Sequence, residues 1–122
     1  MHLRVQRWIL DEFALPGRLF ADIVEALYRD DQLMRGELVV AGRRVGPDAL
    51  VVPLLNVIDP GSTAIPRSAI EPFHHAGASR HKALLEYHGD RGVGLQHVGV
   101  LVGQRAHAML WPQIIDWIRR LA

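Results

Sequence analysis

Two apolar segments limit the folds open to this chain more than any other feature. The first, VVPLLNVI, covers residues 51–58, and the second, ALLEYHG, covers residues 83–89. Neither alternates polar and apolar residues, which is typical of strands that are covered on both faces in a parallel sheet. Between them, the turn-rich loop DPGSTAIP precedes a helical pattern over residues 68–78, which Pro72 is expected to bend or to confine to one end. This strand–helix–strand order predicts a doubly wound α/β sheet.

Two helical patterns and one short extended segment flank these strands. Apolar residues recur at helical spacing over residues 16–28 and again over residues 111–121, where Trp-Pro is predicted to open the helix. We expect both helices to turn their apolar faces into the core. Residues 37–40 and 44–45 flank a turn-forming Ala-Gly-Arg, which predicts a short hairpin or an extended arm.

An acid and a histidine follow the two predicted strands. Asp59 comes directly after the first strand, and His97 lies in the glycine-rich stretch GVGLQHVGVLVG, which is predicted to be a loop after the second. In doubly wound sheets, catalytic and ligand-binding residues usually lie on loops that follow the carboxyl ends of the strands. This order matches the last two members of a Ser/Cys–His–Asp triad in α/β-hydrolases. His97 would take the proton of a nucleophile as general base, and Asp59 would orient the imidazole and stabilise its cation.

Both candidates have a plainer interpretation. Asp59 is followed by Pro60-Gly61, which is also typical of an Asx residue that forms a turn, and Ser62 is a candidate cap for that turn. His97 has the alternative of being an ordinary loop residue. The residues alone leave these alternatives open.

The other histidines and the large aromatic residues point to structure rather than chemistry. Four more histidines are His74, His75, His81 and His88. Their spacing forms no ligand pair with a supporting carboxylate, so we expect solvated imidazoles and no bound metal. Three tryptophans are expected to anchor the core or an interface, namely Trp8, Trp111 and Trp117. In the first helix, the residues expected in the core include Phe20, Leu27 and Tyr28.

Composition excludes several classes of function. Lys plus Arg number 14 against 13 for Asp plus Glu, which gives a net charge of +1. We therefore expect only weak electrostatic attraction to nucleic acid or anionic lipid. The chain has no cysteine, which excludes disulfides, thiolate metal sites and a cysteine nucleophile within it. No apolar run is long enough to cross a bilayer and the first residues lack the apolar core of a secretion signal, so we expect a cytoplasmic protein.

Six stretches in order along the chain resemble the carboxyl-terminal third of polyhydroxyalkanoate synthases, most closely the class III type. They are WILD, LPGRLF, ALYRDDQLMRGELVVAGRRV, VPLLNVI, AIP and QHVGVLVGQRAHAMLWPQIIDWI. The resemblance implies the carboxyl-terminal portion of an α/β-hydrolase fold. Residues 1–50 would then form a cap-region helix and an extended arm, and residues 51–122 the last parallel strands with their helices. In the family the cap covers the acyl pocket, so Phe20, Leu27 or Tyr28 would have a second possible role there.

The resemblance also assigns roles and reveals two departures. The family's conserved histidine corresponds to His97, although Gln96 replaces the glycine that usually precedes it. The family's acid corresponds to Ser62, which cannot supply a charge, and Asp59 lies three residues earlier. The chain also has no G-x-[SC]-x-G nucleophile elbow, so the nucleophile is expected on protein upstream of Met1.

Two hypotheses for function follow from this resemblance. In the first, the parent enzyme moves a 3-hydroxyacyl group from coenzyme A onto a growing polyester, or hydrolyses a related ester, without a metal or other cofactor, and His97 serves a nucleophile outside this chain. In the second, the chain is a non-catalytic scaffold, regulatory segment or remnant of the same fold. Either way we expect association with an amino-terminal half or with itself, because a few buried strands alone expose a sheet edge and an apolar face. A truncated product, a separate subunit and a self-associating remnant all fit this expectation.

Overall fold

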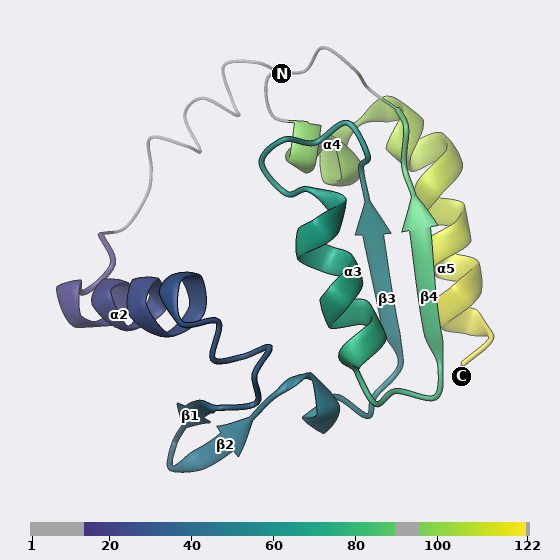
Figure 1. Ribbon diagram of the computed structural model, residues 1–122. Helices are drawn as coiled ribbons and strands as arrows, with labels where there is room; N and C mark the ends of the chain where they lie inside the picture. The colour runs from purple at the N-terminus through teal and green to yellow at the C-terminus, as the bar shows by residue number, and fades with distance from the viewer. Residues whose placement is uncertain (1–13, 90–95, 122) are drawn as a thin grey trace.

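The chain folds as a small α/β unit with a helix and a hairpin beside it (Figure 1). The computed structural model describes residues 14–89 and 96–121 and, within these, the side chains of all but Gln96 and His97.

The two apolar segments form a pair of parallel strands. β3 (Leu54–Ile58) and β4 (Lys82–Glu86) lie in register, with Leu54 opposite Lys82 and Ile58 opposite Glu86. The predicted parallel pairing is therefore confirmed. The first strand begins three residues later than its apolar run, since Pro53 has no amide hydrogen to give to a ladder.

One face of this strand pair carries the main hydrophobic core. Tyr87, Ala106 and Leu110 are buried there, with Val57 and Leu85 packed against them. Side chains alternate between the faces of a strand, so Val57 and Leu85, which are opposite each other in the register, point the same way.

The opposite face is covered by α3 (Arg67–Ala76), the crossover helix between the strands (Figure 1). The predicted helix is confirmed, and Pro72 lies inside it. The helix ends against the strand: a Cβ at Gly77 would come within 3.2 Å of the Leu54 side chain. A glycine there lets the chain pass close to β3 on its way to β4.

The last helix begins at the predicted Trp-Pro, and a π-helical segment precedes it directly. The π-helical segment is η3 (Ala106–Leu110), and Pro112 lies in the first turn of α5 (Trp111–Arg119), as predicted. In the π-helical turn just before Pro112, the backbone hydrogen bonds span five residues instead of the four of an α-helix. Proline has no amide hydrogen to donate to such a bond. The apolar stripe of α5 is only partly covered: Trp111 packs against the core, whereas Ile118 is 54% exposed.

The amino-terminal part extends to one side of the strand pair (Figure 1). Its helix joins α2 (Gly17–Asp22) to the π-helical η1 (Ile23–Arg29), which confirms a helix at the predicted place. The expectation that its apolar residues enter the core is wrong: Phe20 is 58% and Tyr28 82% exposed. Within the described part of the chain, nothing packs over this side of the helix to bury it.

A hairpin follows this helix, as one of the two predicted alternatives. β1 (Leu38–Val40) and β2 (Arg43–Val45) pair antiparallel around a two-residue turn. Both turn residues have positive φ, 49° at Ala41 and 76° at Gly42, the sign pattern of the type I′ turns that match strand twist. The short 3₁₀ segment η2 (Pro47–Ala49) then touches α3 and leads the chain to β3.

Candidate functional site

The carboxyl ends of β3 and β4 meet at one edge of the strand pair, because the strands are parallel. Asp59 is the first residue after β3. α4 (Gln96–Val102) follows β4 along the chain and lies over the same edge in Figure 1. The backbone therefore brings the segments that carry both candidate residues to one end of the sheet.

His97 lies in a helix and not in the predicted loop. It is the second residue of α4, so that prediction is wrong for the backbone around it. Gly99 is buried and Val100 half-buried on the same helix, so two of the small apolar residues of the predicted loop lie on the covered side of α4. The imidazole itself lies outside the described side chains, and its meeting with Asp59 stays a prediction.

Asp59 takes part in the turn that follows β3. Its Oδ1 accepts a hydrogen bond of 2.8 Å from the amide of Gly61, and its backbone carbonyl accepts one of 3.0 Å from the amide of Ser62. The predicted Asx-turn role is confirmed. One such bond leaves the carboxylate with further acceptor sites, so turn formation and orientation of an imidazole are compatible for this side chain.

Ser62, in the position that the family resemblance assigns to the acid, holds the same turn. The residue is only 7% exposed, and its Oγ accepts a hydrogen bond of 3.2 Å from the amide of Ile65. The predicted capping role is confirmed. The acid's position is thus filled by a buried hydroxyl with a backbone partner.

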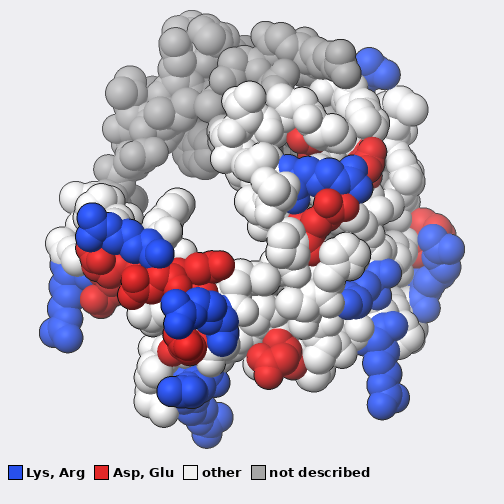
Figure 2. Space-filling view, viewed as in Figure 1, with Lys and Arg blue, Asp and Glu red and all other residues white. Residues whose placement is uncertain are grey.

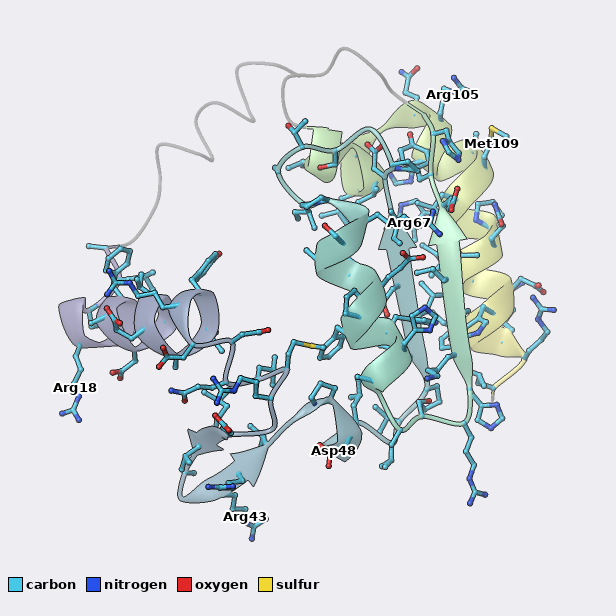
Figure 3. The ribbon with its side chains drawn as sticks, in the orientation of Figure 1. Arg18, Arg43, Asp48, Arg67, Arg105 and Met109 are labelled. Carbon is cyan, nitrogen blue, oxygen red and sulfur yellow. The ribbon has the colours of Figure 1, made fainter. Side chains whose placement is uncertain are left out.

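A cluster of charged side chains near this edge was missed by the sequence analysis. Arg67, labelled in Figure 3, pairs with Glu71 at 2.7 Å on its own helix and with Glu86 at the end of β4. Glu86 also contacts Nε2 of His88 at 3.2 Å. The four-residue spacing of Arg67 and Glu71 is a sequence signal for the first pair, although the predicted helix began one residue after Arg67. The contact from α3 to β4 has no such signal, because it joins residues far apart in the chain.

The charges of this cluster stabilise one another. Hydrogen bonding to Arg67 lowers the pKa of Glu71 and that of Glu86, and the two carboxylates raise the pKa of the Arg67 guanidinium. His88 further favours the ionised form of Glu86. The cluster thus keeps two carboxylates ionised on the exposed side of α3 and β4.

One of the four histidines expected to be solvated is buried. His74 is 7% exposed, and its Nδ1 lies 3.0 Å from Oδ1 of Asn56 on β3. Burial lowers its pKa, and the nearby His75 and Lys82 add to this effect. The reason is its place on α3, where it points at the strand, whereas His75 is exposed.

No clear metal site or membrane span occurs in the part of the chain that the structure describes. Within residues 14–89 and 96–121, no three His, Cys, Asp or Glu side chains lie close enough to hold an ion. The described helices are all too short or too polar to cross a bilayer. Trp8 lies outside the described residues.

Sequence comparison supplies the family context. The chain is similar to polyhydroxyalkanoate polymerase subunits. It is 29% identical to the poly(3-hydroxyalkanoate) polymerase subunit PhaC of Haloferax mediterranei over 114 residues, which are 93% of this chain and 22% of that protein. For the subunit of the same name in Haloarcula marismortui, the identity is 28% over 93% of this chain and 23% of that protein. For that of a Synechocystis species it is 23% over 95% of this chain and 29% of that protein.

These matches confirm the resemblance inferred from the sequence motifs. The chain spans about a quarter of the length of these polymerase relatives. No family model matches the chain. No solved structure matches it either, and the parallel strand pair with its crossover helix is what identifies the fold as α/β.

Proposed function

We propose that this chain is the carboxyl-terminal α/β-hydrolase segment of a polyhydroxyalkanoate polymerase-like acyltransferase, and that His97 is its general base. The similarity to polymerase subunits along more than nine tenths of the chain supports the assignment. The observation that carries the site is the parallel strand pair, which brings Asp59 and the helix with His97 to one edge.

The chemistry follows from those two groups. His97 takes the proton of a thiol or hydroxyl nucleophile, which then attacks the carbonyl carbon of a 3-hydroxyacyl thioester. The thiol of coenzyme A leaves with that proton. In the second half, His97 deprotonates the hydroxyl at the end of the growing polyester, which attacks the acyl-enzyme ester or thioester. The bond between the acyl group and the enzyme breaks, and the enzyme's thiol or hydroxyl takes the proton back from His97. Asp59 keeps the imidazole in the tautomer that accepts the proton.

The nucleophile of this reaction comes from protein outside these 122 residues. The chain has no cysteine. Of its three serines, Ser62 and Ser79 are buried and engaged in turns; Oγ of Ser79 bonds both the carbonyl and the amide of His81, at 3.0 and 3.2 Å. Partner protein that supplies the nucleophile would also extend the strand pair and add the donors that stabilise the tetrahedral intermediate.

The two parts of the chain would have different tasks in that enzyme. Residues 51–122 supply the strand pair and the edge that carries the site. Residues 1–50 would belong to the cap over the acyl pocket. The exposed Phe20 and Tyr28 support this role, because an apolar surface of this kind suits an acyl chain or a neighbouring apolar face.

A chimera tests the enzymatic proposal. The 114 matched residues of the Haloferax mediterranei subunit are replaced by this chain, and release of free coenzyme A from 3-hydroxybutyryl-coenzyme A is followed with a thiol reagent. We expect activity that His97→Ala reduces at least about a thousandfold, as for loss of a triad base. His75→Ala, an exposed histidine on α3, is the matched control and should keep the rate.

The alternative is a non-catalytic role, as a scaffold or regulatory segment of the same fold. Ser62 favours it, since a hydroxyl that is engaged in a turn stands where the family's acid is expected. A chimera that folds, as judged by circular dichroism, but releases no coenzyme A would contradict the enzymatic proposal and support this alternative. Equal rates for His97→Ala and the unsubstituted chimera would remove His97 from the mechanism.

A further inference from the structure

A pocket of about 420 Å³ lies at the amino-terminal end of β4, at the opposite end of the strand from Asp59 and α4. It forms where the loop after α3 meets the end of α5. The side chains that matter for recognition are Arg80, His81, Lys82, Trp117, Arg120 and Leu121. Its volume falls within the range of small-molecule sites.

The pocket is cationic. Arg80, Lys82 and Arg120 line it, and no acidic side chain does so among the described residues. Figure 2 shows blue Lys and Arg side chains toward the lower right of the molecule. A cluster of positive side chains without a lining carboxylate favours an anion.

The three cations differ in how much of their hydrogen bonding is already used. Nζ of Lys82 donates to the carbonyls of His75 and Gly77, at 3.1 and 3.0 Å, and so caps the end of α3. Arg120 pairs with Asp116 at 2.6 Å through one nitrogen. The side chain of Arg80 makes no hydrogen bond or ion pair within residues 14–89 and 96–121. All N–H donors of the Arg80 guanidinium are therefore available to a ligand. Arg120 can offer the donors that its pair with Asp116 does not use.

The other wall is apolar and aromatic. Trp117 is half-buried and Leu121 lies beside it in the pocket lining. An indole beside guanidinium groups suits a ligand with a flat ring and a negatively charged group. The ring stacks on the indole, and the charged group accepts hydrogen bonds from the guanidinium groups.

We propose that this pocket binds a small phosphate monoester with a flat heterocycle, of the nucleoside monophosphate class. The phosphate accepts hydrogen bonds from Arg80 and Arg120, and the base packs on Trp117 and Leu121. Bidentate contact with phosphate is a geometry that arginine provides and lysine does not. The site is independent of the proposed acyl transfer, since it shares no residue with the edge that carries Asp59.

The test uses the full chain and adenosine 5′-monophosphate as the probe. Binding is followed by the shift of the Trp117 indole resonance in ¹H–¹⁵N spectra, which Trp117→Phe assigns among the three tryptophans. We expect a saturable shift with a dissociation constant at or below about 1 mM. Arg80→Gln should weaken binding at least about tenfold, through the loss of a charge-assisted contact.

Two controls make the result specific. Arg105→Gln removes the same charge from an exposed residue at the other end of the molecule, labelled in Figure 3, and should leave the affinity unchanged. Inorganic phosphate and adenosine test the two halves of the ligand, and each should bind at least about tenfold more weakly than the nucleotide. No saturable shift with the nucleotide, equal losses for Arg80→Gln and Arg105→Gln, or phosphate binding as tightly as the nucleotide would each overturn the proposal.

Discussion

Leu110 is the side chain whose truncation should most loosen the attachment of the carboxyl-terminal helices to the strand pair. It is 2% exposed and lies in the core with Tyr87 and Ala106, at the junction of η3 and α5. Leu110→Ala removes roughly three buried CH₂ equivalents at about 0.8 kcal/mol each, or about 2.4 kcal/mol. The cavity left behind adds to this, so the total loss in the free energy of unfolding should be about 3–4 kcal/mol.

The neighbouring Met109 provides a matched control. It is 60% exposed and, as Figure 3 shows, lies at the surface, so Met109→Ala should cost less than about 0.5 kcal/mol. Urea unfolding of the full chain, followed by circular dichroism, compares the two variants directly. If Leu110→Ala were no more costly than Met109→Ala, the core that we describe between η3 and the strands would be wrong. Because α4 packs against η3, a loosened η3 should also lower activity in the chimera through displacement of His97.

Three further predictions concern charge. The pKa of His74 is lowered by burial below its usual 6.5, so the unfolded state binds the proton more tightly. The free energy of unfolding should therefore be insensitive to this group above about pH 6.5 and fall as the pH drops through its folded-state pKa. His74→Gln should flatten that dependence in urea unfolding at a series of pH values, whereas His75→Gln, which removes only the smaller contribution of a neighbouring imidazole, should preserve most of it. Asp59→Asn, which keeps the side-chain oxygen of the Asx turn, should lower the rate of the chimera by more than about a hundredfold if the carboxylate orients His97; an unchanged rate would leave Asp59 with only its turn. Arg67→Met should raise the pKa of Glu86 toward the ordinary value in a carbon-detected NMR titration, with little change in stability because the pair is exposed; an unmoved pKa would contradict the assigned cause.

The local patterns of the chain were sufficient for most of its element order; the exception is α4, which was predicted to be a loop. The two apolar runs, the intervening helix and the turn around Ala41-Gly42 all depend on residues close in sequence, and each was predicted where it occurs. The Asx turn of Asp59 and the cap by Ser62 were available for the same reason, since their partners lie two or three residues away. The family resemblance depended on the order of short motifs and needed no coordinates.

The sequence by itself determined a strand–helix–strand unit, a hairpin and flanking helices, because periodicity and turn residues act over a few positions. Only the tertiary structure decided which surfaces are covered. It left Phe20 exposed on a helix with a clear apolar side, buried His74 against β3, and joined Arg67 to Glu86 across elements. Burial and cross-element contacts depend on residues distant in the chain that the fold brings together, and no local pattern encodes that proximity.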